Sequence, residues 1–134
     1  MIRRMLIASV FGLSLYAGTS EACFGSYTSK AAKVPVTFRL EDKGISSFEA
    51  FGKSYDPKDV AVDFLGTYGN SEILQIKYSS AKDHESVIKL FAVVVDGSVK
   101  LVTGYLIDFE LNTDNSMKIH KLVPLEFRLI QQKQ

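Results

Sequence analysis

Two apolar runs separated by Asp96-Gly97 constrain the fold of this chain more than any other feature of its sequence. The runs cover residues 87–95 and 99–111. Asp-Gly between such runs favours a two-residue hairpin turn, because both residues tolerate positive φ. A polar loop at residues 112–116 leads into a further run at 118–130. The sequence therefore predicts three consecutive antiparallel strands joined by short turns.

The turns also predict a register, and with it a core face. Setting Val95 opposite Ser98 and Phe109 opposite Ile119 gives these further apolar-face pairs: Val94–Val99, Ala92–Leu101, Leu90–Thr103, Ile88–Tyr105, Tyr105–Val123, Thr103–Leu125 and Leu101–Phe127. The charged pairs Glu110–Lys118 and Asp108–His120 then lie on the opposite face of the sheet. The second face still carries Phe91, Val93, Val95, Val102, Leu106 and Leu122, so we expect the N-terminal segment or a partner to cover part of it. A slip of one residue would invert every side chain.

The rest of the chain adds two predicted strands and an ambiguous segment at 41–66, in which Phe48, Phe51 and Tyr55 have helical spacing. The predicted strands alternate through Val34, Val36, Phe38 and Leu40, and later through Leu74, Ile76 and Tyr78. Pro35 favours an edge position for the first of these strands. Asp56-Pro57 is typical of a helix start, whereas Val60, Val62 and Phe64 alternate as a strand would. The predicted fold class is mainly β, an antiparallel meander forming a small two-layer β-sandwich, with a short helix around 57–65 as the alternative to a strand.

The first 22 residues have the order of a removable export signal. Arg3 and Arg4 precede an apolar run at residues 5–17, and Ser20 and Ala22 place small residues before Cys23. The run is shorter than the roughly 20 residues of a transmembrane helix. We therefore expect a signal peptide at 1–22, a flexible tether at 23–33 and a single β domain at 34–134.

Cys23 is the only cysteine, so the chain cannot form an internal disulfide. Three states are open to it. They are a thiol on a flexible end, the lipidated first residue of a lipoprotein, and an intermolecular disulfide. Ser20 and Glu21 depart from the Leu and small residue that usually precede a lipidated cysteine.

The charge balance excludes one class of partner. Removing Arg3, Arg4 and Glu21 from the 16 basic and 15 acidic residues leaves 14 of each. Proteins that bind nucleic acid usually carry a basic excess or a basic stripe. We therefore expect no nucleic-acid partner.

The sequence predicts no catalytic, cofactor-binding or metal site, and hence no enzyme. His84 and His120 are expected to be exposed, and a zinc site would need further ligands at suitable spacing. The alternating oxygen donors Asp108, Glu110, Asn112 and Asp114 match no closed calcium loop. No glycine-flanked nucleophile or glycine-rich phosphate loop occurs. The aromatic group Phe38, Phe48, Phe51, Phe64 and Tyr68 is expected in the core, with a ligand pocket as the alternative.

Residues 34–51 resemble the start of the transthyretin-like lipoproteins of type VI secretion, in which a Pro-Val strand, a polar turn and a Phe-containing segment follow a lipidated cysteine. The resemblance implies an outer-membrane lipoprotein of a secretion system.

The residues themselves favour a different function. They predict an exported, non-enzymatic accessory or assembly protein of the cell envelope, periplasmic or secreted, that contacts another envelope protein. A secreted inhibitor or immunity-type protein and a small-ligand carrier are the alternatives. Membrane contact, and anchoring at the outer membrane, are expected only if Cys23 is lipidated.

Overall fold

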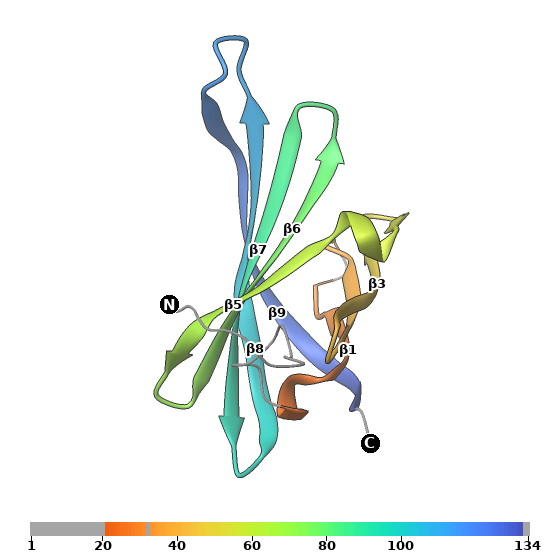
Figure 1. Ribbon diagram of the computed structural model, residues 1–134, viewed down its shortest axis with the longest axis vertical. Coiled ribbons are helices and arrows are strands. Elements are labelled where there is room, and N and C mark those ends of the chain that lie inside the picture. The colour runs from red at the N-terminus through yellow and green to blue at the C-terminus, as the bar shows by residue number, and fades with distance from the viewer. Residues whose placement is uncertain (1–20, 32, 133–134) are drawn as a thin grey trace, which may run out of the picture.

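The computed structural model describes residues 21–31 and 33–132, which form mainly β-strands (Figure 1). The elements, with η for a 3-10 helix, are η1 (Glu21–Cys23), β1 (Gly25–Ser29), β2 (Val36–Glu41), β3 (Gly44–Ala50), β4 (Lys53–Tyr55), η2 (Pro57–Asp59), β5 (Ala61–Tyr68), β6 (Ser71–Ala81), β7 (His84–Val95), β8 (Ser98–Leu111) and β9 (Met117–Gln132). The strands form a 9-stranded antiparallel sheet in the order β4-β3-β2-β1-β9-β8-β7-β6-β5. The predicted mainly β, antiparallel meander is confirmed.

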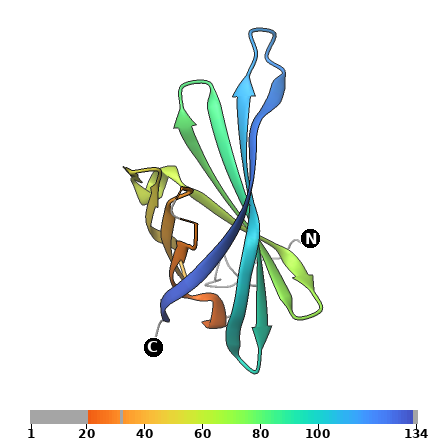
Figure 2. The same ribbon diagram turned by 180° about the vertical axis from the view of Figure 1, so that it is seen from behind.

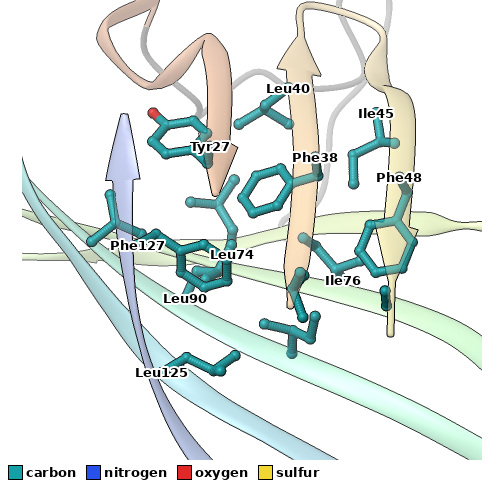
Figure 3. Close-up of a cluster of buried hydrophobic side chains, with 14 of the residues drawn as sticks. Tyr27, Phe38, Leu40, Ile45, Phe48, Leu74, Ile76, Leu90, Leu125 and Phe127 are labelled. Atoms are coloured by element: carbon teal, nitrogen blue, oxygen red, sulfur yellow. The ribbon is translucent and has the colours of Figure 1, made fainter. Parts of the chain in front are cut away.

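The sheet is strongly twisted and bends over on itself, so that β1–β3 lie against β6–β8 while the long β9 connects the two halves (Figures 1 and 2). Figure 3 shows the core between the halves, where Phe38 and Phe48 point toward Leu74 and Ile76. The Phe48 ring on β3 lies 4.7 Å from the Tyr78 ring on β6, centroid to centroid. The inner faces of the two halves therefore bury one another, as in a two-layer sandwich.

The Asp96-Gly97 hairpin starts in the predicted register and then departs from it. Val95 pairs with Ser98 and Val94 with Val99, but a bulge follows at Val93/Val94. Beyond the bulge, Ala92 pairs with Val102, where Leu101 was predicted. A bulge places two residues opposite one and so shifts the rest of the ladder by a residue.

The β8–β9 hairpin departs from the predicted register in the same way. Phe109 pairs with Ile119 and Glu110 with Lys118 as predicted, until a bulge at Asp108/Phe109. Asp108 then pairs with Lys121 instead of His120, and the predicted pairs of Leu101, Thr103 and Tyr105 with β9 are likewise wrong by one residue.

The two bulges exchange the predicted faces of β8. Val102 and Leu106, which were assigned to the second face, are 4% and 2% exposed and belong to the core. Leu101 and Tyr105, which were assigned to the core face, are 41% and 48% exposed. On β7, Phe91 lies on the outer face with Leu101 and is only half-buried.

The segment predicted as a flexible tether contains a strand. β1 pairs with β2 on one side and β9 on the other. Cys23, Phe24 and Tyr27 are buried in the core. β1 has the sequence GSYTS, with Tyr27 as its one large apolar side chain, and so it gave no strand signal. Residues 1–20 of the predicted signal lie outside the described part, and Glu21 and Ala22 begin η1.

Pro35 does not place its strand at an edge, because β2 lies between β1 and β3. Pro35 precedes the first paired residue, Val36, so its missing N–H interrupts no ladder bond. Its carbonyl oxygen accepts a hydrogen bond from the Phe51 N–H at 2.8 Å. The prediction failed because a proline just before a strand does not bar that strand from the interior of a sheet.

The ambiguous segment at 41–66 contains β3, β4 and the start of β5, with one short helical turn, η2, between β4 and β5. The helical spacing of Phe48, Phe51 and Tyr55 therefore does not correspond to a helix. Asp56 caps η2 by accepting a hydrogen bond from the Lys58 N–H at 3.1 Å, as the Asp-Pro signal predicted. The helix ends at Asp59, however, and 61–68 is β5, which pairs with β6. The helix over 57–65 is therefore wrong beyond its first turn. Within the described residues, no helix is long and apolar enough to cross a membrane.

Candidate functional site

The outer face of the β8–β9 hairpin carries a continuous run of apolar side chains. Its consecutive cross-strand pairs are Leu111–Met117, Phe109–Ile119, Ile107–Leu122 and Tyr105–Pro124, and we call these residues the apolar stripe. Ile119 and Leu122 are 60% and 58% exposed, and Tyr105, Leu111 and Met117 are also exposed. An exposed patch of contiguous apolar side chains on a soluble domain commonly marks an interaction surface.

Charged side chains border the apolar stripe on the same face. On β7, Glu85 pairs with Phe109 and Lys89 with Tyr105. On β9, Glu126 follows the stripe and forms an ion pair with Lys30 at 2.8 Å. An apolar centre with a polar rim is the usual composition of a protein–protein interface. Sequence reasoning had placed Tyr105, Ile107, Phe109 and Ile119 in the core, and so it missed this surface.

The inner face of the same strands carries a polar cluster centred on Asp108. Ser80 and Ser86 Oγ donate to Asp108 Oδ1 at 3.0 and 2.9 Å, and His84 Nδ1 lies 2.8 Å from Asp108 Oδ2. Burial alone would raise the pKa of Asp108, but the hydrogen bonds from His84, Ser86 and Ser80 outweigh it and lower that pKa. Asp108 is therefore an ionised carboxylate held by β6 and β7.

The fold brings together the two histidines, which sequence reasoning had treated separately. Their ring centroids lie 5.3 Å apart. Glu110 lies beside both, 3.9 Å from His84 Nε2 and 3.8 Å from His120 Nδ1. Asp108 was predicted to pair with His120, yet His84, which ends the tight β6–β7 turn, lies beside it in the β7–β8 ladder instead. That turn, 81–84, gave no signal for this contact because its partner is distant in the sequence.

The cluster does not have the arrangement of a serine hydrolase. A serine nucleophile needs a histidine base to accept its proton. Here Ser80 and Ser86 donate to the carboxylate, and no described serine hydroxyl donates to a histidine ring. No group of three or more histidine, cysteine or carboxylate side chains in 21–31 and 33–132 is placed to hold a metal ion.

The candidate calcium donors each contact different neighbouring groups. Asp108 binds the β6–β7 side chains, and Glu110 lies 3.6 Å from Lys118 Nζ. Asp114 accepts from the Ser116 N–H and Oγ within the 112–116 turn, and these bonds lower the pKa of Asp114. The carboxylates therefore do not converge on one point.

Cys23 lies in the core, with 1% of its surface exposed. Its Sγ donates a hydrogen bond to Glu72 Oε1 at 3.4 Å, and its carbonyl oxygen accepts one from Tyr27 Oη at 2.7 Å. A lipid on this sulfur, or a disulfide to another chain, would require residue 23 to leave the position described here.

The predicted aromatic group is divided between the core and the surface. Phe38 and Phe48 are buried and Phe64 is half-buried. Phe51 and Tyr68 are 45% and 83% exposed, so their assignment to the core is wrong. Phe51 lies in the β3–β4 turn with a φ of 53°, and Tyr68 lies at the end of edge strand β5.

Comparisons with models of protein families, with curated protein sequences and with solved structures gave no match.

Proposed function

We propose that this protein is an exported, non-enzymatic domain of the cell envelope, and that it binds another envelope protein through the apolar stripe. The observation that carries the proposal is the exposure of large apolar side chains in consecutive cross-strand pairs of β8 and β9. Burying such side chains against a partner contributes about 25 cal/mol for each Å² of apolar surface removed from water.

Export rests on the N-terminal sequence. Arg3 and Arg4, the apolar run and the small residues at Ser20 and Ala22 predict removal of 1–22. The intact mass of the protein recovered from the envelope tests this: a chain that begins at Cys23 supports export, and a chain that retains 1–22 contradicts it.

The lipoprotein of a secretion system stays as the alternative, based on the resemblance at 34–51 and on a cysteine at the predicted cleavage site. The burial of Cys23 favours the unlipidated form. A mass increase equal to a diacylglycerol group would favour the lipoprotein.

Site-specific photo-crosslinking in the native cell tests the binding surface. A benzophenone amino acid replaces Ile119, in the apolar stripe, or Tyr68, an exposed aromatic residue on β5 outside it. We expect a discrete adduct with another protein from position 119 and none of that mass from position 68. The same adducts from both positions, or only a dimer of this chain, would contradict the proposal.

A charged variant separates binding from folding. Ile119→Lys should leave the unfolding midpoint nearly unchanged, because the side chain is 60% exposed. The same change should abolish the adduct formed from a probe at Met117, a neighbouring position of the stripe. If the adduct persists at full yield, the apolar stripe is not the binding surface.

A further inference from the structure

A second candidate site lies on the inner side of the sheet, between the β3–β4 hairpin and the strands that carry Asp108. It is a cavity of about 250 Å³. Phe51, Lys53 and Tyr55 line it from the hairpin, and Tyr78, Asp108 and Lys121 line it from the opposite half. A water molecule takes about 30 Å³ of liquid volume, so the cavity has room for an occupant of about eight to ten non-hydrogen atoms.

The walls of this cavity are aromatic. The Tyr55 and Tyr78 rings lie 5.0 Å apart, centroid to centroid, and meet edge to face. Phe51 is held at the cavity by the left-handed β3–β4 turn, in which it has a φ of 53°. Burial raises the pKa of Tyr78 to about 12, so this hydroxyl stays neutral. Such walls suit a planar, apolar body.

The charges around the cavity favour an anion. Lys53 Nζ lies 5.0 Å from the centre of the Tyr55 ring, and Lys121 Nζ lies 5.0 Å from the centre of the Phe51 ring. Neither lysine forms an ion pair with a described carboxylate. Asp108, the carboxylate among the lining residues, is already bound by His84, Ser80 and Ser86. Its oxygens are therefore engaged, and the two lysine charges exceed the one carboxylate charge among the lining residues.

We infer that this cavity binds a small aromatic carboxylate, with the ring against Tyr55, Tyr78 and Phe51 and the carboxylate between Lys53 and Lys121. The two lysines come from opposite halves of the sheet, so an anion held by both would bridge the β3–β4 hairpin and β9. The cavity is on the inner side of the sheet, so its ligand would not contact the outer apolar stripe.

Benzoate is the probe, and two molecules of the same shape are its controls. The ¹⁵N-labelled protein is titrated with benzoate, neutral benzamide and cationic benzamidine, and amide shifts are followed by NMR. We expect saturable shifts at Phe51, Tyr55 and Lys121 with benzoate, an affinity at least about tenfold weaker with benzamide, and no saturation with benzamidine. Equal affinity for benzoate and benzamide, or benzoate shifts confined to other regions, would overturn the inference.

A matched pair of lysine variants tests the charge contribution. Lys121→Gln should weaken benzoate binding about three- to fivefold, since an ion pair open to solvent contributes little free energy. Lys100→Gln removes an exposed lysine near the Asp96-Gly97 turn, at the other end of the sheet, and should leave the affinity unchanged. Benzoate affinity that falls equally in both variants, or in neither, would refute recognition at Lys121. Unchanged amide spectra outside the substituted regions confirm that both variants are folded.

Discussion

Two leucines of β8 test which face of the strand is the core. Leu106 is 2% exposed and Leu101 is 41% exposed, and they lie on opposite faces of the same strand. Replacing each in turn by alanine removes the same atoms. The predicted register without bulges would make Leu101 the core residue, whereas the bulged register makes it Leu106.

The expected loss of stability follows from burial. Leu→Ala removes three carbon atoms, which at about 0.8 kcal/mol per buried CH₂ amounts to about 2.4 kcal/mol. Leu106→Ala loses all of this and leaves a cavity, so the free energy of unfolding should fall by about 3–4 kcal/mol. Leu101→Ala loses roughly the buried three-fifths and leaves no closed cavity, so its cost should be about 1–1.5 kcal/mol.

Urea denaturation followed by far-UV circular dichroism measures both values, since the chain has no tryptophan. For a domain of just over 100 residues, the difference of about 2 kcal/mol corresponds to a difference in Tm of roughly 8 °C. An equal loss of unfolding free energy in the two variants, or a larger loss for Leu101→Ala, would refute the bulged register and the assignment of the outer face.

Three other predictions concern a turn, a carboxylate and a thiol. Gly97→Val should lower the free energy of unfolding by about 1 kcal/mol or more, because Gly97 has a φ of 77° that a β-branched residue resists; coincident urea midpoints would contradict it. The lowered pKa of Asp108 adds stability above its unfolded-state pKa of about 3.9, and this stability is lost as the pH falls through the lower folded pKa. Asp108→Asn should therefore flatten the acid limb of the unfolding free energy measured from pH 6 to pH 2, and an unchanged limb would exclude this role. Cys23, at 1% exposure, should react with a thiol reagent at least about a hundredfold more slowly in buffer than in urea, and comparable rates would show that it is accessible in the native protein.

The sequence by itself located β2 and β6–β9 to within about three residues at each end, whereas β1, β3 and β4 were not predicted. Alternation of apolar residues and the Asp96-Gly97 turn are local signals, and the residues at that turn have the paired positions predicted for them. The Asp56-Pro57 signal likewise gave the start of η2, because capping involves only adjacent residues. A short polar strand such as β1 gave no signal of this kind.

The tertiary structure decided which face of β8 is buried. Both faces carry large apolar residues, as Leu101 and Val102 show, so alternation gives no preference between them. A bulge adds one residue to a strand without a distinctive sequence, and the choice of face follows from which side the N-terminal strands cover. The same folding brought His84 to Asp108 and placed Phe51 beside Lys121, contacts between residues far apart in the chain. The first contact depends on the register of β7 and β8, and the second depends on how the sheet bends. No local pattern encodes either.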